Sequence, residues 1–209
     1  MFAFVTAGAV VFLLLVISEF MWRSGNVDPE YTRKFVHVSV GSFVAFWPFF
    51  LDRTEIVGLS LAFIAVVAAA HYLDVFKAMR SVQRPTWGEI FFALSVGFVA
   101  VVAHSNWIYT IALLHMSLAD GLAAMVGIKY GKSTRYFVFR HAKSAVGTAT
   151  FLAISLAILT CYSLATPHSF SLLFIPLAVV VTVLENLAIR GLDNLLVPLL
   201  VAVGLNLIG

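Results

Sequence analysis

The chain has 209 residues, of which 62% are hydrophobic and 11% are charged, and its formal net charge at pH 7 is +3. An ordinary soluble domain has roughly a quarter of its residues charged, so this composition excludes that class, and it also excludes a disordered chain. The single cysteine, Cys161, excludes a disulfide-stabilised scaffold. We therefore interpret residues 1–209 as a single integral membrane domain.

Several stretches of the chain approach the roughly 20 mainly apolar residues that a membrane-spanning helix needs. They cover residues 2–20, 34–51, 56–74, 88–103, 107–128, 145–165, 170–189 and 193–208. The last stretch is short and contains Pro198, so we expect eight spans, with seven as the alternative. The first stretch has no basic residue before it, which favours an uncleaved helix over a secretion signal. The predicted fold is an all-α, polytopic membrane helical bundle.

The charged residues are distributed unevenly between the two ends of these predicted helices. Of the 13 basic residues, only Arg53 lies in a loop that follows an even-numbered segment. The positive-inside rule therefore predicts that the odd-numbered loops face the cytoplasm and that the N-terminus lies outside. The rule does not explain the 10 acidic residues, of which all but Asp52 and Glu55 lie near the same ends. We therefore expect the functional site at the cytoplasmic face.

A first candidate cluster lies at the start of the second segment. In a helix, Arg33 and His37 are four residues apart on one face, with Lys34 beside them. Cationic groups at a helix start repel one another and oppose the helix dipole, and a bound anion would relieve both effects. The alternative is that these residues serve to retain this end in the cytoplasm.

Two carboxylates enter otherwise apolar segments. Glu89 opens the fourth segment without a basic neighbour in the sequence, and Asp120 is embedded in the fifth. A charge in a membrane segment costs several kcal/mol unless it is paired or hydrated, so both are candidate functional residues. Small residues four apart around Asp120 are typical of close helix packing, which would also allow a phosphate to approach the backbone. The stretch continues with the candidate residues Gly121, Gly127, Lys129 and Lys132.

A helix start and a turn add further polar residues. The sixth segment is opened by Lys143, Ser144, Gly147 and Thr148. Free backbone N–H groups beside a lysine are suited to binding phosphate. Carboxylate and amide oxygens combined with phosphate are what Mg²⁺ prefers. The candidate metal ligands are therefore Asp120, Glu185, Asp193 and Asn194, with a structural polar cluster between the last two segments as the alternative.

These carboxylates and cations are predicted to lie at one depth on one face. Such a mixture serves an anionic substrate with a divalent metal, so we expect phosphoryl or nucleotidyl transfer. The sequence contains no Walker loop and no paired Cys/His metal motif.

At these residues the sequence resembles the polyprenol kinase family of CTP-dependent lipid kinases, which includes dolichol, phytol and farnesol kinases and the yeast-type diacylglycerol kinase. The resemblance runs from about Glu30 to Pro198. It rests on Arg33-Lys34-x-x-His37, Gly88-Glu89, Asp120-Gly121, Gly127-x-x-Tyr130-Gly131, Lys143-Ser144-x-x-Gly147-Thr148, Glu185 and Asp193-Asn194. It implies that the γ-phosphate of CTP is transferred to a membrane alcohol with the help of Mg²⁺. It also implies that Arg33, Lys34, Asp120 and Gly127 are essential.

The expected function is phosphorylation of an isoprenoid alcohol such as phytol, farnesol or dolichol at the cytoplasmic face. Either Glu89 or Asp120 accepts the hydroxyl proton, with Glu89 slightly favoured, while Arg33 and Lys34 act on the phosphate charge. The expected nucleotide-binding residues are Arg33, Lys34, His37, Gly121, Gly127, Lys129, Lys132, Lys143, Ser144, Gly147 and Thr148.

Three alternatives stay open at this point. They are a CTP-dependent diacylglycerol kinase, a membrane cytidylyltransferase and, from another class, a small transporter. The signature of the related CDP-diacylglycerol synthases is absent, and the predicted outer loops are short and nearly uncharged, which disfavours transport. The expected partners are CTP and a membrane lipid alcohol, and no nucleic acid is expected. The residues alone determine neither the choice of CTP over ATP nor the oligomeric state.

Overall fold

The computed structural model of the chain describes residues 2–24, 29–73, 87–139, 141–166 and 171–208. The basic residues of the predicted third loop, Lys77, Arg80 and Arg84, lie outside these ranges. The helices are α1 (Phe2–Arg23), α2 (Pro29–Ala45), α3 (Arg53–Leu73), α4 (Gly88–Val102), α5 (Asn106–Leu114), α6 (Asp120–Tyr130), α7 (Ala145–Ala165), α8 (Phe174–Leu187) and α9 (Asp193–Ile208). A π-helical turn, His115–Ala119, joins α5 to α6, and short 3₁₀ turns cover Trp47–Phe49 and Lys132–Thr134.

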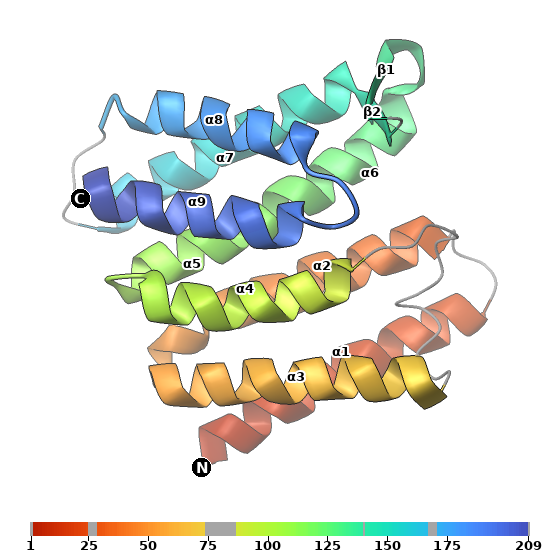
Figure 1. Cartoon of the computed structure of the whole chain (residues 1–209), viewed down its shortest axis with the longest axis vertical. Coiled ribbons are helices and arrows are strands. Elements are labelled where there is room, and N and C mark those ends of the chain that lie inside the picture. The colour runs from red at the N-terminus through yellow and green to blue at the C-terminus, as the bar shows by residue number, and fades with distance from the viewer. Residues whose placement is uncertain (1, 25–28, 74–86, 140, 167–170, 209) are drawn as a thin grey trace.

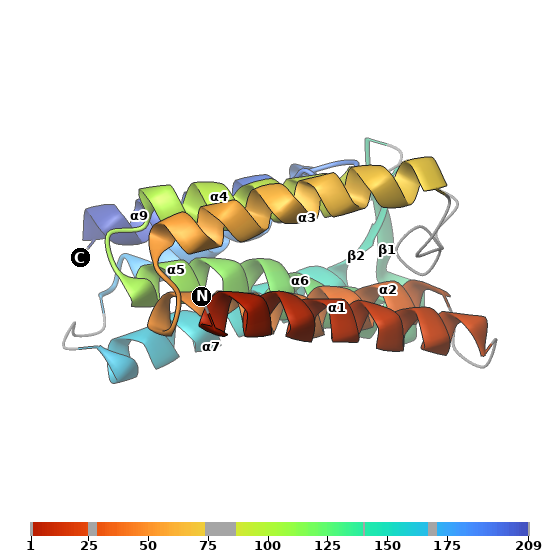
Figure 2. The same ribbon diagram turned by 90° about the horizontal axis from the view of Figure 1, so that it is seen from below.

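The helices lie roughly alongside one another in layers. Seen from below, α3, α4 and α9 run along one side and α1, α2 and α7 along the other, with α5 and α6 between them (Figure 2). Both termini lie at the end of the molecule opposite the small β1–β2 hairpin (Figure 1). This arrangement places both termini away from the predicted cytoplasmic end of the helices.

Each predicted segment corresponds to a helical stretch, but the second was placed too late in the chain. Helix α2 begins at Pro29, before the charged residues Glu30 and Arg33, and ends at Ala45. A 3₁₀ turn follows, with Pro48 in its first positions, where a proline needs no backbone N–H. The charges therefore lie within the first turns of α2 rather than in the loop before it.

The composition of the helix surfaces fits a membrane protein. By length and apolar composition, three helical stretches in the described part of the chain could cross a membrane, Phe2–Arg23, Asn106–Tyr130 and Ala145–Ala165. Large apolar side chains face outward, including Phe20, which is 75% exposed, and Leu207, which is 83% exposed. Polar groups such as Lys34, Asp120 and Glu185 are instead buried. The prediction of eight spans stays a prediction, because the other helices are shorter or less apolar.

The expectation of an all-α protein was incomplete, because a two-stranded antiparallel sheet follows α6. Strand β1 (Arg135–Val138) pairs with β2 (His141–Ser144), with Arg135 opposite Ser144 and Val138 opposite His141. Phe139, between the strands, has a left-handed φ of 46°, which is typical of a tight turn. The strands are too short to show a clear alternation of apolar and polar residues. The basic residues in this stretch led to the prediction of a loop.

Candidate functional site

A polar cavity of about 510 Å³ lies among α2, α6, β2, α7 and the α8–α9 turn, and the start of α4 also lines it. Most of the predicted site residues line it, namely Arg33, Lys34, Asp120, Gly127, Lys143, Ser144, Gly147, Thr148, Glu185, Asp193 and Asn194. The predicted residues that do not line it are His37, Glu89, Gly121, Lys129 and Lys132. The structure therefore brings together residues from four regions that are far apart in the sequence.

Asp120 is the central carboxylate of the cavity. Its Oδ2 lies 2.8 Å from the ammonium of Lys34 and 3.1 Å from Nε2 of His37. The same His37 nitrogen lies 2.7 Å from the carbonyl oxygen of Met116. A carbonyl oxygen can only accept a hydrogen bond, so Nε2 carries the hydrogen. Helix α2 thus supplies two partners that hold one carboxylate oxygen of α6 in place.

The local backbone explains why Asp120 meets α2. The π-helical turn ends directly before Asp120 and includes Met116, whose carbonyl accepts the hydrogen bond from His37. Such turns interrupt the regular helical hydrogen bonds and are frequent at functional sites. A Cβ atom at Gly41 would lie 2.5 Å from Cβ of Ser117, and one at Gly121 would overlap Val38. Gly121 therefore serves close packing of α2 against α6 rather than lining the cavity.

The cations at the start of α2 each have a carboxylate partner. The sequence had instead predicted a cluster of cations that repel one another unless an anion binds. Arg33 donates to Glu30 at 2.6 Å, and Lys34 pairs with Asp120 as described. Arg33 and Glu30 are three residues apart, so the same helical spacing that gathers the cations also supplies a carboxylate. Arg33, Lys34 and Glu30 all line the cavity. A bound anion is thus not required to relieve repulsion, although Arg33 still faces the cavity.

A second ion pair joins β2 to α8 at the cavity wall that these two elements form. The Nζ atom of Lys143 is 2.5 Å from the Glu185 carboxylate and 3.1 Å from the backbone oxygen of Glu185. Burial alone would lower the pKa of Lys143, but the adjacent carboxylate outweighs burial and raises the pKa above its ordinary value. The Lys143 ammonium is therefore charged at neutral pH.

The start of α7 packs closely against α6, as the small residues predicted. A Cβ atom at Gly127 would lie 2.9 Å from Oγ of Ser144 and 3.4 Å from Cα of Gly147. Ser144 caps α7 by accepting a hydrogen bond from the backbone N–H of Gly147 at 3.1 Å. Gly127, Ser144 and Gly147 all line the cavity, so backbone is accessible at this helix start.

The sequence did not indicate a three-residue polar contact that fixes the hairpin. The hydroxyl of Tyr136 hydrogen-bonds to Thr148 Oγ1 at 2.6 Å and donates to Oδ1 of Asn186. The single hydroxyl hydrogen of Thr148 is shared between the Tyr136 oxygen and this Oδ1, which lies 3.0 Å away. The contact ties β1 to α7 and α8 at the edge of the cavity. Among the cavity-lining residues that were not predicted as site residues, the charged or titratable ones are Glu30, Arg135, His141 and Arg190.

The α8–α9 turn joins this wall to the start of α4. The backbone N–H of Trp87 donates to the carbonyl of Arg190 at 3.1 Å, and the amide of Asn194 donates to the carbonyl of Gly88 at 3.0 Å. Arg190 and Gly191 have positive φ angles of 56° and 90°, which make the turn sharp. Glu89 lies in the first turn of α4 and is half-buried, and it is not among the residues that line the cavity.

Lys129 and Lys132 are exposed and lie outside the cavity lining. The Lys129 ammonium lies 5.1 Å from the centroid of the Tyr130 ring. Their expected role in nucleotide binding stays a prediction. Two other residues of this region, Arg135 and His141 of the hairpin, line the cavity.

The carboxylate and amide oxygens of the cavity suit a magnesium ion that is bound together with the phosphates of a nucleotide. They suit a magnesium ion without a nucleotide less well. Within the described part of the chain, no three His, Cys, Asp or Glu side chains form a metal-binding group. Lys34 already holds Asp120, and Lys143 holds Glu185. Asp120 and Asp193 both line the cavity, so a cation bound there would offset their negative charges. Mg²⁺ commonly takes one or two carboxylates and completes its shell with phosphate and water.

Comparison with proteins of known function shows one clear similarity. The chain is 34% identical over 203 residues to the phytol kinase of Synechocystis sp., and the match covers 92% of this chain and 83% of that protein. No protein-family profile matches the chain. No solved structure matches it either.

Proposed function

The chain belongs to the polyprenol and phytol kinase family, and we propose that it transfers the γ-phosphate of CTP to the hydroxyl of an isoprenoid alcohol such as phytol. Membership of this family makes it a kinase that acts on a lipid alcohol. The observation that carries the proposal is the cavity, which gathers carboxylates, cations and an open helix start beside apolar helices. The choice of CTP rests on the family resemblance of the sequence motifs.

The phosphates of the nucleotide are proposed to bind at the start of α7. Lys143 provides a positive charge at the cavity, and Gly127 and Gly147, which also line it, let α6 pack closely against this helix start. A helix N-terminus offers N–H groups and a partial positive charge to an anion. Arg33 lies on the other wall, where it can neutralise charge as the γ-phosphate is transferred.

Asp120 is the proposed general base. As the hydroxyl oxygen of the alcohol attacks the γ-phosphorus, its proton passes to Asp120, the bond to the β–γ bridging oxygen breaks, and CDP leaves. Lys34 lies 2.8 Å from the carboxylate and keeps it ionised before the reaction. Glu89 was slightly favoured for this role from the sequence, but Asp120 lines the cavity and Glu89 does not.

Magnesium is proposed to bind at Asp193 and Asn194, with Asp120 nearby, and would offset the negative charge of the phosphates when bound. Glu185 as a ligand stays a prediction, because Lys143 holds its carboxylate. We further propose that the protein crosses the membrane several times with this cavity at the cytoplasmic face, as the positions of the basic residues indicate.

A transfer assay with purified protein tests the function. The reaction contains Mg²⁺, γ-labelled CTP or ATP, and phytol, farnesol, dolichol or diacylglycerol in separate tubes. We expect label in a lipid-soluble product, with CTP as the better donor and an isoprenoid alcohol as the better acceptor. Release of pyrophosphate with formation of a CDP-lipid would instead identify a cytidylyltransferase. Preference for diacylglycerol would contradict the proposed acceptor.

A further inference from the structure

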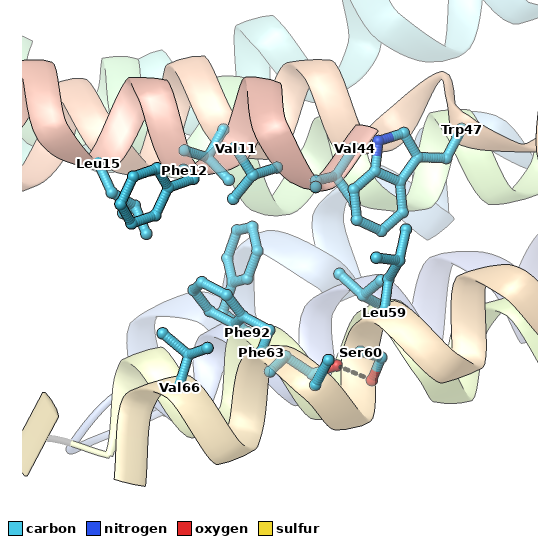
Figure 3. Close-up of a pocket in the computed structure, with 15 residues that line it drawn as sticks. Val11, Phe12, Leu15, Val44, Trp47, Leu59, Ser60, Phe63, Val66 and Phe92 are labelled. Carbon is cyan, nitrogen blue, oxygen red and sulfur yellow. Dashed lines mark hydrogen bonds between the residues drawn. The ribbon is translucent and has the colours of Figure 1, made fainter. Parts of the chain in front are cut away.

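A second cavity, of about 140 Å³, lies among α1, α2, α3 and α4 (Figure 3). Its described lining is apolar or aromatic apart from two polar groups, the hydroxyl of Ser60 and the indole N–H of Trp47. That hydroxyl donates to the carbonyl oxygen of Ala93 at 2.7 Å, so it is already satisfied. The indole N–H of Trp47 has no hydrogen-bond partner among the described residues, and the rest of the lining offers a ligand apolar surface. Burial of an apolar chain is the interaction that such a lining favours.

This cavity reaches the outer surface of the helices. Phe12 of α1 and Val66 of α3 both line it, and they are 56% and 43% exposed. Figure 3 shows both side chains beside the deeper residues Leu15 and Phe63. Since α1 is long and apolar enough to cross a membrane, we place this opening toward the lipid. A chain longer than the cavity can therefore extend into the bilayer.

The apolar cavity lies directly beyond the polar one along two helices. On α2, Lys34 lines the polar cavity and Val40 lines the apolar cavity, six residues or about 9 Å further along the axis. On α4, Gly88 and Phe92 line the two cavities in the same order, about 6 Å apart. The two cavities therefore follow each other along the same pair of helices.

An aromatic contact links the apolar cavity to the residues around Asp120. The ring of Phe92 meets the ring of His37 edge to face, with 5.7 Å between the centroids. His37 in turn lies 3.1 Å from the Asp120 carboxylate. Phe92, which lines the apolar cavity, thus contacts His37, and His37 contacts the proposed base Asp120 at the polar cavity.

We propose that the cavity among α1–α4 binds the isoprenoid tail of the alcohol and so selects for chain length. The inference rests on the proposed function, since it assigns the polar end of the same substrate to Asp120. Phe92 and His37 mark the boundary between the tail and the head group. The occupant is a methyl-branched hydrocarbon chain, which matches a lining that offers no unsatisfied hydroxyl.

Two glycines between α1 and α3 allow a matched test. A Cβ atom at Gly8 would have its nearest neighbour, Leu59, at 3.9 Å, and one at Gly58 would have Phe4 at the same distance. Gly8 lines the apolar cavity and Gly58 does not. Gly8→Phe should therefore fill the cavity, whereas Gly58→Phe adds the same group between the same helices outside it.

The measurement is kcat/KM for phytol and for geraniol, a shorter isoprenoid alcohol, with each purified variant. We expect Gly8→Phe to lower the value for phytol by about tenfold relative to geraniol. Gly58→Phe should leave the phytol-to-geraniol ratio at the wild-type value. An unchanged ratio in Gly8→Phe, with active protein, would overturn the tail site while leaving the kinase function intact.

Photolabelling of the wild-type protein tests binding of the tail directly. It requires neither catalytic turnover nor an amino-acid substitution that could impair folding. Phytol carrying a diazirine at the end of its tail should label peptides of α1 and α3, and excess phytol should compete. Labelling that phospholipid removes equally well would mean that ordinary membrane chains fill the cavity, and labelling confined to other helices would place the tail elsewhere. Either result rejects the assignment.

Discussion

At the scale of single residues, the pairing of Asp120 with Lys34 is difficult to explain by stability alone. Asp120 is 7% exposed and Lys34 is 5% exposed. Desolvating two charges can cost as much as their attraction returns, so a well-packed apolar pair would often serve a structure equally well. The pair instead keeps a carboxylate ionised at a cavity wall. We interpret this as preparation for proton transfer and for binding of an anion.

The hydroxyl of Tyr136 gives a test of the hairpin's role. Tyr136→Phe removes a group that contacts Thr148 and Asn186, and it should cost about 1 kcal/mol of stability, as expected for a lost hydrogen-bonded hydroxyl. Because the contact holds β1 at the cavity, KM for CTP should rise while KM for the alcohol stays constant. Steady-state kinetics with each substrate varied in turn measures both.

Tyr72→Phe is the control for this substitution, since Tyr72 is 90% exposed and does not line the polar cavity. It should match the wild type in thermal midpoint and in both KM values. A Tyr136→Phe protein that also matches the wild type would show that the hairpin does not position the nucleotide.

At the scale of elements, the position of the site depends on how closely α2 approaches α6 and its preceding π-helical turn. Gly41 and Gly121 permit this approach, since a side chain at either would meet Ser117 or Val38. The approach is what brings His37 within reach of Met116 and Asp120. Disturbing the helix contact should therefore affect both stability and the site.

Gly121→Ala tests this contact, because the new methyl group would overlap Cγ2 of Val38. Overpacking of this kind costs about 1–3 kcal/mol, so the thermal midpoint should fall. Val38→Ala removes the obstructing group, and the double variant should recover much of the loss. Thermal unfolding in detergent of the wild type, both single variants and the double variant measures this coupling. Additive losses would mean that the two residues are not in contact.

The helices were largely predictable, whereas the hairpin and several partners were not. Long apolar runs such as 145–165 identify helices because their length exceeds what a strand needs. Strand β1 has four residues, which is too short for periodicity to distinguish from a loop. The sequence indicated Asp120 by its isolated charge, but its contact with Lys34, 86 positions away, arises from tertiary packing. Asn186 gained its contact with Tyr136 in the same way.

At the scale of the whole molecule, the structure separates a polar end from an end that carries both termini. The hairpin lies at the polar end, and the α4–α5 connection lies at the other (Figure 1). The distribution of basic residues predicts that the polar end is cytoplasmic, where a nucleotide is available.

Cysteine labelling in intact cells tests this orientation. Cys161 is exposed, so Cys161→Ser provides a background without reactive cysteine. On that background, His104→Cys lies between α4 and α5, and Ser133→Cys lies beside the hairpin. A membrane-impermeant maleimide should label position 104 in intact cells and position 133 after permeabilisation. The reverse pattern would contradict the predicted orientation.

The central claim, that phosphoryl transfer takes place at Asp120, is tested most directly by comparing Asp120→Asn with Glu89→Gln. Both substitutions replace one carboxylate by an amide in the first turn of a helix, but Asp120 lines the polar cavity and Glu89 does not. The measurement is the rate at which equal amounts of folded, purified protein transfer label from γ-labelled CTP to phytol. Asp120→Asn should lower this rate by about 10²–10⁴-fold, as expected for loss of a general base, and Glu89→Gln by less than about tenfold. Near-normal transfer by Asp120→Asn, or a larger loss in Glu89→Gln, would contradict the account.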